Sequence, residues 1–444
     1  MIPVHFLYNK KKGMWKVKKR RSFLFMKMKK FVMSFSLALA ATTVITGCSA
    51  GPNGRPDGQS ATTTTTVVET VPLENVKGSD KGDAATESTT EPSEKVEAET
   101  DLTAKEYVTI TDHMDRTVTV KANPKTCVVL DIYPLPSVLC LYLNSADSIL
   151  AMEPASMNAA KSGTLSEIYP EILNTSTEIM NGEDVNIEAV MDLNPDVVYF
   201  NAGNADLAAQ LENAGLHAVA FSATKFGFDA VDTYDQWVEL LGQIYPDNAK
   251  AGLVSDKSNE ILELIAKDAA KIEKEKKVLF LFQYDDTKMI TSGNKFWGQY
   301  WCDSVNAENV AGALTEQTTN AKITMEQVYE WDPEVIIITN FTPVQPQDLY
   351  DNAIGADDWS SVTAVENGQV YKMPLGVYRT YTPGVDTPMT IEWLAKTIYP
   401  EYYESIDLES DVKKYYNDIY GVTLSDEQIK KMYNPSSNAG SMND

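Results

Sequence analysis

The chain has 444 residues, enough for two or three domains with their own hydrophobic cores. It carries 38 Lys and Arg against 63 Asp and Glu, and residues 1–47 hold 11 of the basic residues and none of the acidic ones. The remainder is therefore strongly acidic and repels phosphate backbones, which excludes nucleic acid as the expected partner.

A basic and then apolar segment opens the chain. Two lysines follow Met28, an uncharged and largely apolar run extends over 31–45, and small residues precede Cys48. This pattern is typical of a secretory signal peptide, and the run is short for a membrane span. The letters "ITGC" resemble a bacterial lipobox, in which the signal is cut before the cysteine and the cysteine is lipid-modified. We interpret residues 1–47 as a signal peptide that starts at Met28, with Cys48 as the lipid anchor; an ordinary signal with an incidental cysteine is the alternative.

A polar stretch follows the cysteine, over residues 48–104. It contains five consecutive threonines, many acidic residues and no aromatic side chain. Such a segment cannot bury enough apolar surface to offset its chain entropy, so we predict a disordered tether that holds the folded body away from the membrane. Three further cysteines, Cys127, Cys140 and Cys302, have no metal-ligand spacing, and we expect them to be buried as small hydrophobic side chains.

The first lobe is predicted over residues 105–246. A hairpin turning at 114–116 is followed by apolar runs that indicate strands at 127–130, 149–152, 197–200 and 217–221. Helical patterns such as 206–214 lie between them. Strands that alternate with helices predict an α/β layered lobe with a mainly parallel sheet.

A long helix is predicted over residues 247–276, with Asp247 as its N-cap. The strand and helix alternation then resumes in a second lobe, 277–444, with strands at 278–284, 335–339 and 370–371. Two amphipathic helical patterns lie near the end of the chain. The whole body is therefore predicted as two Rossmann-like α/β lobes, with mainly parallel sheets, joined by one long helix.

The two predicted lobes contain a repeated passage. "NIEAVMDLNPDVVYFNAGN" begins at Asn186 and "TMEQVYEWDPEVIIITNFT" begins at Thr324, and in each a helix ends in an acid-x-x-Pro turn before an apolar strand. Proline ends the helix, and an unbroken Val/Ile run fits a strand that is covered on both faces. Polar loops follow both strands. Ligands bind at the carboxyl ends of strands in open parallel sheets, so two such lobes facing each other would enclose a cleft.

Further segments extend the pattern beyond this repeat. "ITDHMDRTVTV" begins at Ile110, "DDWSSVTAVENGQVYKMPLG" begins at Asp357, and "TPMTIEWLAKTIYPE" begins at Thr387. In order and spacing they resemble, from Tyr107 to about Pro400, the extracytoplasmic binding proteins of ABC importers for ferric siderophores, haem and cobalamin. The resemblance implies the class III periplasmic-binding-protein fold, limited hinge motion and a ligand held between the lobes. It also implies an ABC permease with its ATPase as partner, a monomeric protein and a location at the outer face of the bacterial cell membrane.

Other classes of function find little support in the sequence. A secreted hydrolase needs a nucleophile with a base, a metal cluster or a carboxylate pair. Beyond Cys48 the histidines are His113 and His217, and neither lies in a zinc motif. We therefore predict that the protein is not an enzyme, and we expect no cofactor and no metal bound directly by side chains. A surface adhesin is the remaining alternative, and it would not need the polar loops at the strand ends.

The ligand is predicted to be a bulky chelate, because the strand-end loops are rich in aromatic and amide groups. Too few histidines are present for a site that binds free zinc or manganese. A ferric siderophore is our first choice, with haem and cobalamin as alternatives. Arg379, between two tyrosines in a loop after a strand, is the expected contact for an anionic group on the ligand. The predicted ligand-binding residues are Tyr133, Asn201, Asn204, Gln283, Tyr284, Asn294, Trp297, Asn340, Tyr378 and Arg379.

The resemblance also implies one acidic docking residue on each lobe, facing basic residues of the permease. In the first lobe the matching position is Asp206, at the start of the helix after the strand-end loop, where a carboxylate is favoured by the helix dipole. The second copy has a longer loop, and Asp348 is the nearest acidic residue there.

Overall fold

A computed structural model describes residues 106–440 of the chain, apart from Ala249 and 315–320. The described residues belong to one compact unit. The predictions for the signal peptide, the lipid anchor at Cys48 and the tether lie outside the described residues.

The N-terminal lobe is built on a parallel sheet with the strand order β4-β3-β7-β8. An antiparallel hairpin of β1 (Tyr107–Thr111) and β2 (Thr117–Lys121) precedes it, as the sequence predicted. The sheet strands are β3 (Cys127–Val129), β4 (Ile149–Met152), β7 (Val197–Asn201) and β8 (Ala218–Phe221). The helices are α3 (Leu135–Leu143), α4 (Pro154–Ser162), α5 (Leu165–Ile168), α6 (Ile187–Asp192), α7 (Ala205–Asn213) and α8 (Ala230–Ile244), with a 3-10 turn η1 (Pro170–Asn174) and a small hairpin of β5 (Met180–Asn181) and β6 (Asp184–Val185).

The long connecting helix, α9 (Ala251–Ala269), is shorter at both ends than the sequence predicted. At its start, Pro246 opens a 3-10 turn, η2 (Pro246–Asn248), and the side chain of Asp247 accepts a hydrogen bond from Asn123 instead of capping the helix. At its end, the backbone N–H of Lys276 donates to the hydroxyl of Tyr399, so this segment is held by the next lobe.

The C-terminal lobe repeats the same plan with the strand order β12-β9-β14-β15. Its parallel strands are β9 (Lys277–Leu281), β12 (Glu308–Asn309), β14 (Val335–Ile338) and β15 (Val370–Lys372), and β10 (Gln283–Tyr284), β11 (Met289–Thr291) and β13 (Ala321–Lys322) form a smaller antiparallel sheet. The helices are α10 (Trp297–Ser304), α11 (Met325–Trp331), α12 (Pro346–Tyr350), α13 (Thr363–Glu366), α14 (Thr387–Ile398), α15 (Leu408–Tyr420) and α16 (Asp426–Tyr433), and a 3-10 turn η3 (Ser437–Gly440) follows. The predicted α/β class with mainly parallel sheets is confirmed.

The sequence repeat corresponds to the central strand of each sheet. In both copies the residue before the proline is in the left-handed region, with φ 46° at Asn194 and 44° at Asp332. In both copies the acid after the proline accepts a hydrogen bond from the backbone that leads into the neighbouring strand. Asp196 accepts from Lys125 N at 2.7 Å, and Glu334 accepts from Lys277 N at 3.1 Å. The repeat is therefore a structural unit that ends a helix and sets the register of a buried strand.

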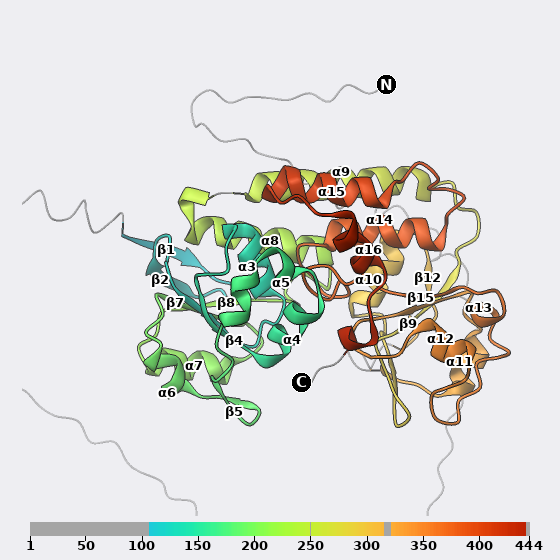
Figure 1. Cartoon of the computed structure of the whole chain (residues 1–444), viewed down its shortest axis with the longest axis horizontal. Helices are drawn as coiled ribbons and strands as arrows, with labels where there is room; N and C mark the ends of the chain where they lie inside the picture. The colour runs from blue at the N-terminus through green and yellow to red at the C-terminus, as the bar shows by residue number, and fades with distance from the viewer. Residues whose placement is uncertain (1–105, 249, 315–320, 441–444) are drawn as a thin grey trace, which may run out of the picture. The chain divides into compact units, whose positions relative to one another are not determined.

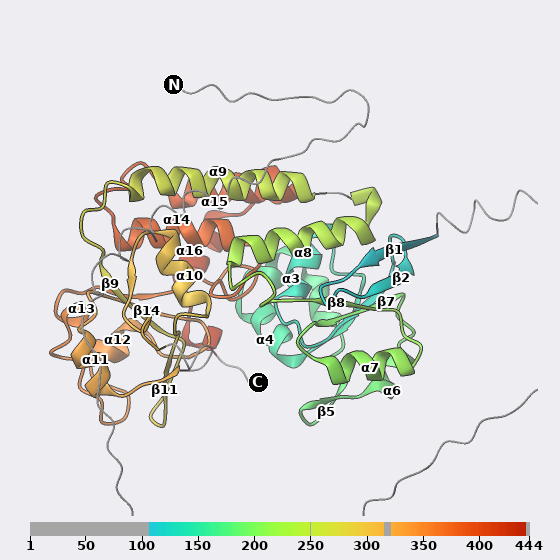
Figure 2. The ribbon, with the colours of Figure 1, turned by 180° about the vertical axis from the view of Figure 1, so that it is seen from behind.

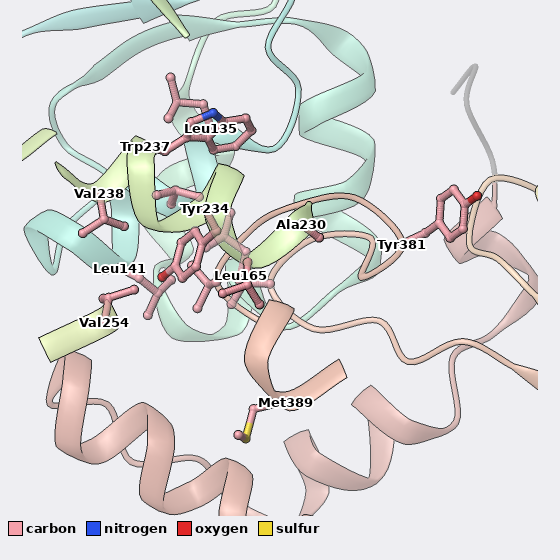
Figure 3. Close-up of a cluster of buried hydrophobic side chains, with 14 of the residues drawn as sticks. Leu135, Leu141, Leu165, Ala230, Tyr234, Trp237, Val238, Val254, Tyr381 and Met389 are labelled. Atoms are coloured by element: carbon pink, nitrogen blue, oxygen red, sulfur yellow. The ribbon is translucent and has the colours of Figure 1, made fainter. Parts of the chain in front are cut away.

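Alternating side chains of each sheet enter two different cores. One face of the N-terminal sheet packs against α6 and α7, and one face of the C-terminal sheet packs against α11, α12 and α13. The other faces of both sheets share one large cluster, which also takes in side chains of α8, α9, α14 and α15. Figure 3 shows part of this cluster, in which Leu135 comes from α3, Tyr234 from α8, Val254 from α9 and Met389 from α14. One core thus extends from lobe to lobe.

The C-terminal helices add to the connection between the lobes. In Figures 1 and 2, α15 runs alongside α9, and α14 lies next to both. Tyr234 of α8 and Tyr420 of α15 share a hydrogen bond between their hydroxyl groups. Beyond α16, Gly440 meets the loop after β14 so closely that a Cβ there would lie 2.0 Å from the carbonyl oxygen of Thr342. Lys431 meanwhile donates to the carbonyl of Gly163 in the N-terminal lobe.

Candidate functional site

A buried loop between β15 and α14 carries Arg379 into the region between the lobes. Residues 372–395 are all buried, although 373–386 form no regular helix or strand. Asp386 holds the loop, because its carboxylate accepts from Val377 N at 3.0 Å and from the hydroxyl of Tyr416 at 2.5 Å. Gly376 allows the carboxylate of Asp386 to lie this close to the backbone of the loop, since a Cβ at position 376 would lie 2.0 Å from Asp386 Oδ2. The loop is thus fixed by internal partners, as a buried backbone requires.

Arg379 lies at the contact between the two lobes. Its side chain is only 1% exposed, and Nη1 lies 3.5 Å from both the carbonyl oxygen of Ala155, in α4, and the hydroxyl of Tyr378. The guanidinium also lies over the rings of Phe341, at 5.2 Å, and Tyr378, at 5.7 Å. The planar guanidinium of an arginine can stack on aromatic faces and also bind an anionic group.

The N-terminal lobe presents an acid and a tyrosine to the same place. Tyr133 follows β3 and is 39% exposed, and Glu153 follows β4 and is 6% exposed. The charge of Glu153 acts on Tyr133 beside it and on Tyr378 in the opposite lobe. Burial, with the nearby charge of Asp131, raises the pKa of Glu153 to about 7. Burial and these two acids also raise the pKa of Tyr133 to about 12.

An aromatic wall extends from the N-terminal lobe to Arg379. Phe228, which precedes α8, contacts Phe296 with ring centroids 5.8 Å apart; Phe296 contacts Phe282 at 5.6 Å, and Phe282 contacts Phe341 at 5.0 Å. Such faces are suited to planar or organic parts of a ligand. The predicted residue Trp297 belongs to this wall through its contacts with Phe228 and Phe296.

Several buried polar atoms near these elements have no hydrogen-bond partner among the described residues. Buried polar atoms are normally paired, so each unpaired one marks a place that a ligand or water can satisfy. Asn158 lies one turn after Ala155 in α4, and Trp297 begins α10. The unpaired atoms at predicted or neighbouring positions are Asn158 Nδ2, Asn294 Oδ1, Trp297 Nε1 and Asn340 Oδ1.

Lys372 and Asn340 hold together the two loops that bear Phe341 and Arg379. The buried ammonium of Lys372 donates to the carbonyl oxygens of Thr339, Thr342 and Val344 at 2.9, 2.7 and 2.8 Å. Asn340 donates back to the carbonyls of Met373 and Pro374, both at 2.8 Å. Burial lowers the pKa of Lys372 to about 7. Three carbonyl acceptors around one ammonium nevertheless favour its charged form.

The predicted asparagines of the N-terminal lobe are placed at the strand ends but are engaged within the lobe. Asn201 N donates to Asp131 Oδ1 at 2.7 Å, and Asn204 Nδ2 donates to Asp131 Oδ2 at 2.8 Å. Asn204 also caps α7 by accepting from Leu207 N. These side chains line a surface concavity together with Gly203 and Asp206.

Tyr284 is buried in the core of the C-terminal lobe, and its role as a ligand contact stays a prediction. Its side chain is 1% exposed and packs in the core behind the C-terminal sheet, where its hydroxyl donates to Asp357 at 2.7 Å and accepts from Trp359 Nε1 at 3.0 Å. The sequence placed it at the cleft because it ends a strand. A buried tyrosine needs partners for its hydroxyl, and here the core supplies them. Gln283, its neighbour in β10, is half-buried.

The two predicted docking residues differ in their surroundings. Asp206 is exposed in the first turn of α7, as expected. Asp348 is half-buried in α12, and its Oδ2 accepts from the backbone N–H of Gln345, so it caps its own helix. The docking role of both stays a prediction.

Sequence reasoning missed Glu153, Asn158 and Lys372. Glu153 follows the apolar run at 149–152 directly, so the same strand-end rule that selected Tyr133 would have found it. Lys372 gave no signal, because one lysine after a short strand looks like an exposed residue. The three cysteines are buried, as predicted, and the structure shows them as free thiols.

Comparison with known proteins decides the family. The family model described as "Periplasmic binding protein" matches residues 138–375, more than half of the chain. The chain belongs to the periplasmic binding protein family. Membership implies an extracytoplasmic solute-binding protein of an ABC importer. The sheets, the connecting helix and the site between the lobes agree with that assignment.

Individual relatives give the range of ligands within the fold. A molybdate-binding protein, MolA of Haemophilus influenzae, is 25% identical in an alignment of 336 residues that covers 70% of this chain and 90% of that protein. A periplasmic solute-binding protein from Veillonella parvula matches with a TM-score of 0.65 and 27% identity, over 75% of this chain and 98% of that one. CeuE of Helicobacter pylori, in a nickel–histidine complex, shares the fold with a TM-score of 0.56 and 20% identity, over 74% and 99% of the chains.

Within residues 106–440, as far as they are described, His, Cys, Asp and Glu side chains form no cluster of three or more that could hold a metal ion. In the same part of the chain, every helix is too short or too polar to cross a lipid bilayer.

Proposed function

We propose that this chain captures an anionic metal chelate, with a ferric siderophore as first choice, between its two lobes and delivers it to an ABC permease. The observation that carries the proposal is Arg379, a buried cation on a fixed loop of one lobe that contacts α4 of the other lobe. The ligand brings its own metal, so no metal-binding side chains and no resident cofactor are required. Haem and cobalamin are alternatives for the same fold.

The aromatic wall supports an organic ligand. Phe228, Phe296 and Phe341 come from both lobes and lie in one series of ring contacts that ends at Arg379. Large organic ligands are commonly held by aromatic faces and a few polar groups. Phe228 and Phe341 are half-buried, so they are the members of the wall that a ligand can reach first.

A metal oxyanion is the second candidate. It is favoured by two observations: the similarity to a molybdate-binding protein, and the buried donors Trp297 Nε1 and Asn158 Nδ2, which have no partner among the described residues. A small tetrahedral anion needs several convergent donors and little space. Arg379 with these two groups would supply them.

A direct binding panel separates the candidates. The purified protein would be titrated calorimetrically with ferric trihydroxamate and ferric catecholate chelates, haemin, cobalamin and molybdate. Tight binding of a ferric chelate supports the first choice, and tight binding of molybdate alone supports the second. Failure of every member of the panel to bind would contradict the proposed ligand class.

The docking proposal is tested separately, with the permease and its ATPase in reconstituted membranes. Rim charges across an interface act mainly on association rate and register. Asp206→Lys combined with Asp348→Lys should therefore leave ligand affinity unchanged and weaken the stimulation of ATP hydrolysis, most clearly at low salt. Unchanged stimulation would remove both residues from the docking model.

We further propose that the protein is a monomer, lipid-anchored at Cys48. Cys48→Ser should release the protein into the medium with its ligand binding intact. Retention of the variant in washed membranes would count against the lipid anchor.

A further inference from the structure

We propose that Glu153 and Arg379 act as ligand contacts of opposite charge, so that the site selects a ligand with a cationic or hydrogen-bond-donating group beside its anionic group. This inference rests on the proposed function, because it specifies the ligand class for the same site. It makes Glu153 a ligand contact, whereas the ligand-binding residues predicted from the sequence include no acid.

The position of Glu153 indicates that its side chain is free for this role. Glu153 is the N-cap residue of α4, where an acid would ordinarily accept from the backbone of the first turn. Its carboxylate makes no such bond, and its charge acts on Tyr133. The helix start is closed by the backbone instead, since Ser156 N and Met157 N donate to the carbonyl oxygen of Glu153.

The charged and titratable groups around Glu153 do not neutralise it. The negative charge of Asp131, which follows β3, raises the pKa of Glu153. The charge of Glu153 in turn raises the pKa of Tyr133, also after β3, and of Tyr378 on the buried loop. Among the described residues no lysine, arginine or histidine forms an ion pair with Glu153. Asp131 adds a second negative charge on the same side, so a positive group is missing from the N-terminal half of the site.

Arg379 belongs to the same site as Glu153. Its guanidinium contacts the carbonyl of Ala155, two residues after Glu153, and the hydroxyl of Tyr378, on which Glu153 also acts. The two charged side chains therefore come from opposite lobes, and both act electrostatically on Tyr378. Asn158, also on α4, has a buried Nδ2 without a partner among the described residues.

The electrostatic consequence differs between ligand classes. Burial and Asp131 raise the pKa of Glu153 to about 7, so a bare dianion binds best when Glu153 is protonated. Its affinity should then fall as pH rises through that value. A ligand that places an ammonium or another donor on Glu153 favours the carboxylate, lowers its pKa and releases a proton. The affinity of such a ligand should rise over the same range.

The test compares three probes on three proteins. The probes are molybdate, a ferric trihydroxamate with a pendant ammonium group, and the N-acetylated form of the same chelate. The proteins are the full-length wild type, Glu153→Gln and the control Glu188→Gln, an exposed glutamate of the same lobe. Binding is measured by calorimetry at about pH 6 and about pH 8, on either side of the Glu153 pKa.

For the wild type and Glu188→Gln, molybdate affinity should fall by about tenfold between the two pH values. The ammonium chelate should bind about tenfold tighter than its acetylated form at the higher pH. Glu153→Gln should remove both effects. If the chelates do not bind, the proposed siderophore is wrong, while the pH dependence of molybdate binding still tests Glu153. The inference is overturned if Glu153→Gln leaves the molybdate profile unchanged, if the ammonium preference survives that substitution, or if neither molybdate nor either chelate binds the wild type at millimolar concentration.

Discussion

In the N-terminal lobe the carboxyl edge of the sheet carries polar side chains arranged around Asp131, whereas in the C-terminal lobe the corresponding edge is buried around Lys372 and Asn340. The strands behind the two edges are equivalent in order and in the acid that follows each proline. The repeated scaffold thus tolerates very different loops at its ligand-facing edge. The N-terminal edge carries the carboxylate of Glu153 and the hydroxyl of Tyr133, and the C-terminal edge carries Arg379 and Phe341.

The largest expected effect tests whether the C-terminal edge depends on its buried lysine. Lys372→Met removes the donor to three carbonyl groups, and we expect a loss of about 4 kcal/mol in the free energy of unfolding. The matched change in the N-terminal lobe, Lys121→Met, breaks an exposed ion pair with Asp196 and should have no resolvable effect. Urea unfolding of both variants measures the difference. Equal free energies of unfolding for the two variants would show that Lys372 stabilises the C-terminal edge no more than Lys121 stabilises the N-terminal lobe.

A second prediction concerns the hairpin that precedes the N-terminal sheet. His113 in its turn accepts from Ser222 N at 3.0 Å, and burial, followed by the charge of Lys225, lowers its pKa to about 4. Between about pH 4 and 6.5 the unfolded chain binds a proton that the folded protein does not, so this group makes stability rise with pH, by up to about 3 kcal/mol.

The control for the hairpin is His113→Gln, whose stability should lack that rise. Unfolding free energies of wild type and variant would be measured across the same pH range. Parallel curves would exclude His113 as the source of the pH dependence.

The smallest expected effect tests the equivalence of the two repeated turns. Asn and Asp adopt the left-handed conformation more readily than alanine does, because their short polar side chains can form local hydrogen bonds. Asn194→Ala and Asp332→Ala should therefore each lower the free energy of unfolding by about 1 kcal/mol. Asp332 also accepts from Thr363 N and Thr363 Oγ1, so its substitution should cost more. Glycine at each position separates the contributions: Asn194→Gly should be nearly neutral, and Asp332→Gly should keep the loss of the two hydrogen bonds. Equal losses at the two positions would contradict this account.

Much of the scaffold was predictable from the sequence, because it depends on local rules. Proline after a helix, unbroken Val/Ile runs and alternating strands and helices identified β7, β14 and the two-lobe plan. The bounds of α9 were not predictable, because its ends are set by tertiary partners such as Asn123 and Tyr399.

The candidate site was predictable only where a residue stands out in the sequence itself. Arg379 could be found because arginine is rare in this acidic chain, and Tyr133 because it follows a strand. Tyr284 could not be placed, since its orientation depends on Trp359 and Asp357, which are distant in the sequence. Glu153 was overlooked among many acids. Its importance depends on burial and on the absence of a cationic partner among the described residues, which only the fold reveals.

The most direct test of the central claim is the ligand affinity of Arg379→Ala, measured by calorimetry at low and moderate salt with whichever member of the binding panel the wild type binds. Arg116→Ala is the matched control, because Arg116 pairs with Asp112 within the N-terminal lobe. We expect a loss of at least about tenfold for Arg379→Ala, partial recovery with Arg379→Lys, and no change for the control. Unchanged affinity of Arg379→Ala under both salt conditions would contradict capture of an anionic ligand between the lobes.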